Sequence, residues 1–123
     1  MHVIEKISHQ LQEQFVSTDC TFVQRIKLLA DHKRTSIDMQ VTFVYDSGEH
    51  LRLLTLCFRE VQQLEIERDS VRCDLGELLF YDDEDGTPLH IGDELSSGFS
   101  IVCNDVDFVD IKEAQQDWIY FVH

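Results

Sequence analysis

The stretch from Ile37 to Tyr45 constrains the fold of this chain more than any other part of the sequence. Apolar side chains occupy every second position there, namely Ile37, Met39, Val41, Phe43 and Tyr45. The residues between them are polar, with Val44 as the one apolar exception. An alternation with a period of two is typical of a strand that buries one face. We therefore expect a strand here.

The residues that follow predict a partner for this strand. The polar run 46–50 contains Gly48, and a glycine accepts the positive φ angle that tight turns require. The next run, 51–58, is apolar at almost every position. A strand, a short loop with a glycine and a second strand predict a β-hairpin. Because the second strand is apolar on both faces, we expect it in the centre of a sheet.

The N-terminal segment and the residues on either side of this hairpin predict further elements. Residues 2–16 carry an apolar stripe at spacings of three and four residues, which is typical of an amphipathic helix packed on a sheet. Residues 20–31 fit either a strand or a helix, and the basic turn 32–35 favours a strand paired with 36–45. Arg59 and Glu60 interrupt the apolar pattern after the second strand, which indicates a bulge or a bend.

The rest of the chain alternates short apolar pieces with turn residues. These pieces lie at 78–81, 89–91, 99–103, 106–111 and 118–122. Short strands at a spacing of about ten residues predict an antiparallel meander. The expected fold class is therefore α+β, as a single domain over residues 1–123. It is mainly an antiparallel β-sheet (meander) with one N-terminal amphipathic helix packed on it.

The cysteines and the N-terminus bear on the compartment. The four cysteines, at positions 20, 57, 73 and 103, are too far apart for a Cys-x-x-Cys redox or zinc pair. Cys57 and Cys103 lie in apolar runs, so we expect buried free thiols. The N-terminus lacks the basic region and the long apolar core of a signal peptide. These features predict a cytoplasmic protein with reduced cysteines.

Sequence motifs for catalysis and for cofactor or metal binding do not occur in the chain. The six histidines form no His-x-x-x-His pair, and there is no P-loop, nucleophile elbow or dinucleotide fingerprint. The acidic run 82–85 does not fit a calcium loop. Aligning Gly86 with its turn glycine puts Tyr81 and Gly92 where an aspartate and a glutamate are needed. We therefore expect no enzyme, no cofactor and no metal site.

The uneven charge of the chain is the main indication of function. Residues 1–72 hold 11 acidic and 9 basic side chains, whereas residues 73–123 hold 13 acidic side chains and a single basic one. Most of the net charge of −14 therefore lies in the last two-fifths of the sequence. Such a region repels nucleic acid and anionic membranes and attracts a basic protein. The predicted contact residues are Asp82, Asp83, Glu84, Asp85, Asp93, Glu94, Asp105 and Asp107.

The size and acidity of the chain are similar to those of small immunity proteins that neutralise a bacterial nuclease toxin. An inhibitor of this kind needs clustered carboxylates on a rigid scaffold and rapid capture by electrostatic steering. One alternative is a non-enzymatic interaction or assembly subunit that binds through the helix or through an exposed sheet edge. Others are a DNA-mimic inhibitor of a DNA-binding protein, and an enzyme or ligand binder whose pocket is built from residues distant in sequence.

Overall fold

The computed structural model describes residues 3–30, 36–66, 78–81, 89–93 and 99–114. A helix and a short 3-10 turn come first, and strands follow. The elements are α1 (Val3–Leu11), η1 (Ser17–Asp19), β1 (Cys20–Ala30), β2 (Ile37–Asp46), β3 (Leu51–Arg59), β4 (Gln63–Ile66), β5 (Leu78–Tyr81), β6 (Leu89–Asp93), β7 (Phe99–Cys103) and β8 (Asp105–Glu113). This confirms the predicted fold class and resolves the ambiguity at 20–31 in favour of a strand. The apolar piece expected at 118–122 lies outside the described residues.

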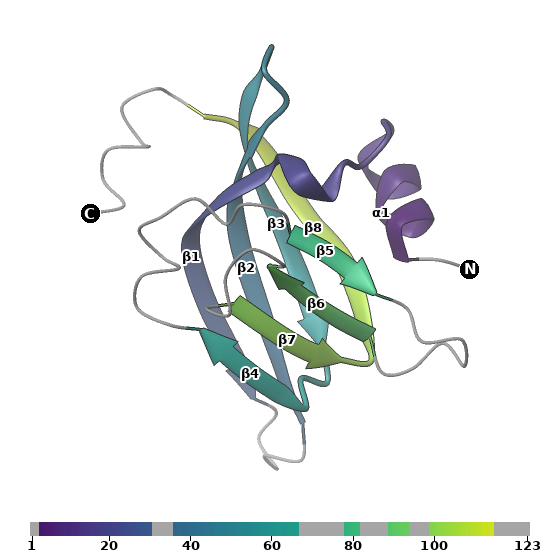
Figure 1. Ribbon diagram of the computed structural model, residues 1–123, viewed down its shortest axis with the longest axis vertical. Helices are drawn as coiled ribbons and strands as arrows, with labels where there is room; N and C mark the ends of the chain where they lie inside the picture. The colour runs from purple at the N-terminus through teal and green to yellow at the C-terminus, as the bar shows by residue number, and fades with distance from the viewer. Residues whose placement is uncertain (1–2, 31–35, 67–77, 82–88, 94–98, 115–123) are drawn as a thin grey trace.

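The strands form two antiparallel sheets of four strands each, with the orders β1-β2-β3-β8 (sheet A) and β4-β7-β6-β5 (sheet B). Each sheet contains a meander of three consecutive strands, as the turn-rich sequence predicts. The fourth strand comes from elsewhere in the chain, because β8 pairs with β3 and β4 pairs with β7. Sheet B lies across one face of sheet A, and the two sets of strands cross obliquely (Figure 1).

The hairpin expected from residues 37–58 is present as β2 and β3. Their antiparallel register runs from Met39 opposite Phe58 to Asp46 opposite Leu51. The turn between them has Gly48 at a φ of 90°, a conformation that glycine adopts without a steric cost. Because β3 lies between β2 and β8, it occupies the central position that its apolar sequence predicts.

The pair β3–β8 continues into the pair β4–β7 through a bend. Arg59 lies opposite Asp105 at the end of the first pair, and Gln63 lies opposite Val102 at the start of the second. Three residues on one strand therefore face two on the other, which is a β-bulge. Glu60, inside this bulge, has a φ of 50° in the left-handed region. The bulge or bend predicted at Arg59 and Glu60 is thus confirmed.

Backbone hydrogen bonds hold the bend on both sides of the bulge. The amide of Asn104 donates to the carbonyl of Arg59 at 2.9 Å, and the amide of Gln62 donates to the carbonyl of Val102 at 2.7 Å. The two strands therefore stay paired while they pass from sheet A to sheet B. Strands that change sheets in this way set the angle at which the two layers pack.

The helix α1 is shorter than the predicted helix over residues 2–16. Val3, Ile7 and Leu11 are buried as the stripe predicts, but the helix ends at Leu11. Gln12 then has a φ of 64°, a left-handed conformation that commonly terminates helices. The prediction was wrong about the helix end, because it counted Phe15 as part of the helical stripe.

Phe15 reaches the core from the extended segment after the helix. Its backbone amide donates to the Ser8 hydroxyl at 2.8 Å, which ties this segment back to α1. Its ring stacks on that of Tyr45, with centroids 5.9 Å apart, and meets the ring of Phe80 edge-on. The Tyr45 hydroxyl in turn accepts a hydrogen bond from the amide of Val16 at 3.0 Å. The expected helical turn is therefore replaced by an extended segment, which the buried Phe15 ring and two hydrogen bonds hold in place.

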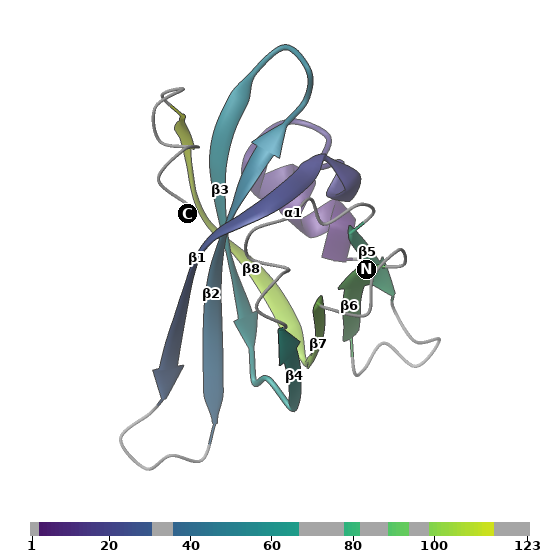
Figure 2. The ribbon, with the colours of Figure 1, turned by 60° about the vertical axis from the view of Figure 1, so that its left-hand side comes forward.

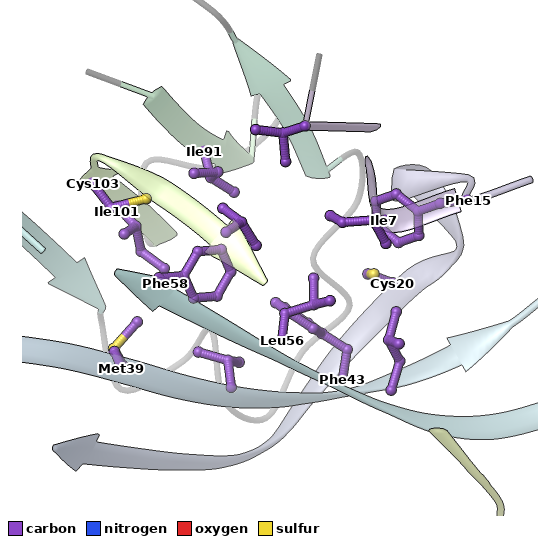
Figure 3. Close-up of a cluster of buried hydrophobic side chains, with 14 of the residues drawn as sticks. Ile7, Phe15, Cys20, Met39, Phe43, Leu56, Phe58, Ile91, Ile101 and Cys103 are labelled. Atoms are coloured by element: carbon purple, nitrogen blue, oxygen red, sulfur yellow. The ribbon is translucent and has the colours of Figure 1, made fainter. Parts of the chain in front are cut away.

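The main core lies between the sheets and is closed on one side by α1 and the Phe15 segment. Phe43 of β2 meets Phe58 of β3 and Phe99 of β7 edge-on, at centroid distances of 6.4 and 6.1 Å. Phe43 is therefore in contact with both sheets. Figure 3 shows side chains from the helix, sheet A and sheet B converging on this space, among them Ile7, Phe15, Met39, Leu56, Ile91 and Ile101.

Three of the four cysteines lie in the described part of the chain, and these three are buried free thiols. Burial raises the pKa of the Cys103 thiol to about 12 and also raises the pKa values of Cys20 and Cys57. A thiol with a raised pKa is a poor nucleophile at neutral pH. These three cysteines therefore act as small apolar core residues, while Cys73 lies outside the described residues.

Replacing Phe43 tests the contact between the sheets. The variant Phe43→Ala leaves a cavity facing Phe58 and Phe99, so we expect its free energy of unfolding to fall by about 3–5 kcal/mol in urea denaturation. Val109 is 42% exposed, and Val109→Ala should change the free energy by no more than about 0.5 kcal/mol. Similar losses in both variants would contradict a core centred on Phe43.

Candidate partner interface

Of the eight predicted acidic contact residues, the structure describes Asp93, Asp105 and Asp107. Asp82, Asp83, Glu84, Asp85 and Glu94 lie outside the described residues. Asp93 is the last residue of β6, where its backbone is described. Asp105 and Asp107 lie on β8, the edge strand of sheet A next to α1. Figure 1 shows the end of β8 that carries these two residues beside β7.

The register of sheet B separates Asp93 from the other predicted positions. In the β5–β6 hairpin, Tyr81 pairs with His90 at one end and Leu78 pairs with Asp93 at the other. Asp93 is therefore at the end of the hairpin remote from His90. At a rise of about 3.4 Å per residue, the three steps from His90 to Asp93 span about 10 Å. Among the described residues, Asp93 therefore ends a strand of sheet B, whereas Asp105 and Asp107 lie on β8 of sheet A.

Asp105 and Asp107 belong to a network of ion pairs that joins α1 to three strands of sheet A. The Lys6 Nζ lies 2.8 Å from Asp105 Oδ2 and 2.6 Å from Asp107 Oδ1. The guanidinium of Arg59 lies 2.9 Å from Asp107 Oδ2 and 2.9 Å from Asp38 Oδ2. These carboxylates therefore hold the helix and the bend in place, and their charge is already shared with internal cations.

The network also shifts the pKa values of its members. The hydrogen bond from Lys6 is the main reason that the pKa of Asp107 is lowered, and Arg59 adds to the effect against the opposing influence of burial. For Lys6, burial lowers the pKa, but the hydrogen bonds and charges of Asp105 and Asp107 together outweigh it, so the net pKa is raised. Both shifts favour the charged forms in the folded state.

A polar hollow of about 410 Å³ lies beside the bend, next to this network. Its walls come from three segments: Ser36 and Ile37, Glu60 to Gln62, and Asn104. The Gln62 side-chain amide donates to Asn104 Oδ1 at 2.7 Å, and the Asn104 amide donates to the Glu60 carboxylate. These contacts hold the carboxylate of Glu60 at the edge of the hollow.

This hollow has the chemistry of a receptor for one cationic side chain. Glu60 supplies a carboxylate that the Asn104 side-chain amide holds in place, and such a group is suited to charge-assisted hydrogen bonding. Ile37, which is 45% exposed, and Val61 supply apolar wall that a lysine or arginine stem can cover. Sequence reasoning identified Glu60 only as part of a bend. Asn104 is 44 positions away, and no local pattern connects the two residues.

Among the residues that the structure describes, no group of three or more His, Cys, Asp or Glu side chains lies close enough to hold a metal ion. The helix in the described ranges falls short of the length and apolarity that crossing a membrane requires.

In comparisons with known proteins, no family model, no curated protein and no solved structure matches this chain. The charges and surfaces of the chain itself therefore carry the information about its function. Two surfaces in the described residues are relevant: the polar hollow beside Glu60, and the ion-paired acidic positions on β8.

The variant Asp107→Asn tests the ion-pair network. Because the folded-state pKa of Asp107 is lowered, its contribution to stability is fully present above the usual pKa near 3.9 and is lost as the pH falls through the lower folded value. We expect the variant to be about 1 kcal/mol less stable at pH 7. This difference should shrink progressively below about pH 4 in denaturation curves.

A matched control for this variant is Asp110→Asn. Asp110 pairs at 3.4 Å with Lys112, which is 66% exposed, and a pair of this kind contributes little to stability. A difference between wild type and Asp107→Asn that does not change from pH 7 to pH 2 would show that Asp107 does not stabilise the fold as a carboxylate.

Proposed function

We propose that this chain is a binding protein for a basic protein partner and that its acidic second half makes the encounter. More specifically, we propose that it is a cytoplasmic immunity protein that inhibits a bacterial nuclease toxin. The uneven distribution of charge along the chain supports this function, because residues 73–123 hold 13 acidic side chains and a single basic one. A nuclease presents a cationic groove for phosphates, and such a groove is the natural counterpart of this half.

Four of the six described lysines and arginines are paired with carboxylates of the same molecule. These four are Lys6, Arg52, Arg59 and Lys112. Their positive charge is therefore matched locally, and the acidic excess of the sequence determines the outer field. A field of one sign raises the rate at which an oppositely charged partner associates.

The fold supplies the rigidity that an inhibitor of this kind needs. The core packs both sheets and the helix into one cluster, and the bend holds the hollow beside Glu60 by backbone hydrogen bonds. A preorganised surface avoids the entropy cost of ordering on binding. A lysine or arginine of the partner that enters this hollow would add a short-range contact to the long-range attraction.

The salt dependence of association tests the electrostatic part of the proposal. The partner is captured on the immobilised chain, identified, and then measured by surface plasmon resonance. We expect a basic protein whose association rate falls steeply between low and high salt, since charges beyond about 8 Å are screened at physiological ionic strength. The dissociation rate should change much less. An acidic or neutral partner with salt-independent association would contradict the proposal.

A charge-reversal set distinguishes a defined site from diffuse attraction. Changing Asp82, Asp83, Glu84 and Asp85 to lysine moves the net charge from −14 to −6. The control makes the same change at four exposed residues elsewhere, Glu5, Glu49, Glu65 and Glu113. If the acidic run is a contact, its reversal should slow association and also speed dissociation, whereas the control set slows association only. Equal effects of both sets would leave no site at 82–85.

The hollow is tested by Glu60→Gln. This change keeps the shape of the side chain and an oxygen that accepts the Asn104 hydrogen bond, but it removes the charge. We expect the partner to dissociate roughly tenfold faster, as for loss of one charge-assisted contact. Glu65→Gln, on the exposed side of β4, is the matched control and should leave the rate unchanged. Identical rates for both variants would remove the hollow from the interface.

A further inference from the structure

The strand β1 presents a free edge that the proposed acidic interface does not use. It lies at the end of sheet A, and among the residues that the structure describes it pairs with β2 on one side only. The other edge of the same sheet, β8, lies against α1, where the side-chain oxygen of Gln10 accepts a hydrogen bond from the amide of Phe108 at 3.2 Å. Within the described ranges, no helix or strand covers β1 in this way. Figure 1 shows β1 on the side of sheet A opposite to α1.

The two halves of β1 differ in regularity. Register shifts occur between Cys20 and Phe22 and between Val23 and Arg25, so the first half is bulged. From Arg25 to Ala30 the pairing with β2 is unbroken. Bulges protect sheet edges against further pairing, whereas a regular edge offers its unpaired amides and carbonyls to another strand. The second half of β1 is therefore the part on which a strand can dock.

This regular half carries two cations that have no carboxylate partner. Arg25 and Lys27 lie opposite Thr42 and Gln40, so both are on the face of sheet A that is turned away from sheet B. Both side chains are exposed and, among the described residues, neither forms an ion pair. The next carboxylate along β2 is that of Asp38, and it already forms an ion pair with Arg59. All four other described lysines and arginines are ion-paired.

The opposite face of the same edge is apolar. Leu28 lies opposite the buried Met39, so it points to the core side of sheet A, yet 59% of its surface is exposed. The reason is visible in Figure 2, where the far ends of β1 and β2 stand away from sheet B. A docking strand would therefore meet cations on one face and an apolar side chain on the other.

We propose that the edge Arg25–Ala30 binds an extended acidic segment of a partner protein, which adds to sheet A as a further strand. Strand addition of this type gains affinity from backbone hydrogen bonds and specificity from alternate side chains. Carboxylates at every second position of the segment pair with Arg25 and Lys27. Apolar residues at the positions between them cover Leu28.

Charge complementarity selects this occupant over two others. A second copy of β1 in antiparallel pairing would bring Arg25 and Lys27 close to their own counterparts, and like charges across a strand pair are destabilising. Nucleic acid is repelled by the net charge of −14. A single acidic strand meets the two cations without bringing a large negative surface close to the rest of the molecule.

A synthetic peptide tests the proposal directly. The probe is a capped seven-residue peptide that alternates glutamate with valine. A peptide with lysine in place of glutamate and a glutamate peptide N-methylated at alternate amides serve as controls. The readout is amide hydrogen exchange by NMR. The amides of Arg25–Ala30 that do not bond to β2 should exchange fast in the free protein and slowly with the glutamate peptide, and neither control peptide should slow them. Slowing by the N-methylated peptide would show charge attraction without strand addition and would overturn the proposal.

Matched substitutions locate the contact. Lys27→Glu should weaken binding of the glutamate peptide about tenfold. Lys112→Glu makes the same change at another exposed lysine of sheet A, on β8, and should not weaken it. Equal losses in both variants would show a dependence on net charge alone and would overturn the proposal.

An alternative role for Arg25 and Lys27 is to prevent this edge from pairing with any strand. If Arg25 and Lys27 only keep the edge from pairing, the wild-type protein will not bind the glutamate peptide at millimolar concentration. The double variant Arg25→Thr, Lys27→Thr will then self-associate in sedimentation velocity. That outcome overturns the proposal. None of these measurements involves residues 82–85 or Glu60, so the proposed function can fail or hold independently.

Discussion

Both sheets depend on one pair of strands that stays hydrogen-bonded while it turns from one layer to the other. Because β3–β8 continues as β4–β7, the inner face of the first pair leads directly into the inner face of the second. Phe58 and Val106 on one side and Ile101 on the other are therefore in the same core cluster. The left-handed conformation of Glu60 costs roughly 1–2 kcal/mol. The hydrogen bonds that the backbone amides of Asn104 and Gln62 donate on both sides of the bulge offset that cost. Without the bend, Phe43 would have no second sheet to pack against.

The N-terminal segment completes the edge that this arrangement leaves open. Lys6 and Gln10, one helical turn apart on α1, reach a carboxylate pair and a backbone amide of β8. Gln12 ends the helix, and Phe15 then turns into the core against Tyr45. The helix is thus held by polar contacts at the strand edge and by apolar contacts beneath it. This combination leaves β1 as the edge of sheet A without a covering element among the described residues.

The local parts of this fold follow from the sequence, and the long-range parts do not. Alternation along 37–45 and the glycine turn after it predict the β2–β3 hairpin, and the charged pair Arg59 and Glu60 predicts the bend. The pairing of Arg59 with Asp105 has no local signal, because 46 positions separate two segments whose side-chain patterns fit several partners. The helix end was misplaced for a related reason. Phe15 keeps the helical spacing, but a left-handed residue at Gln12 cannot be recognised from apolar spacing.

Composition identifies an acidic chain, but only the fold shows which charges are already satisfied. Asp105 and Asp107 count as acidic in any sum, yet Lys6 and Arg59 take up much of their charge. Arg25 and Lys27 change the total charge little, yet no carboxylate of the described residues pairs with them at the edge of sheet A. The edges β1 and β8 are separated by three strand spacings, or about 14 Å. That distance exceeds the screening length of about 8 Å at physiological ionic strength. Carboxylates at one edge therefore cannot neutralise cations at the other, and a protein of strongly negative net charge can present a local surface of the opposite sign.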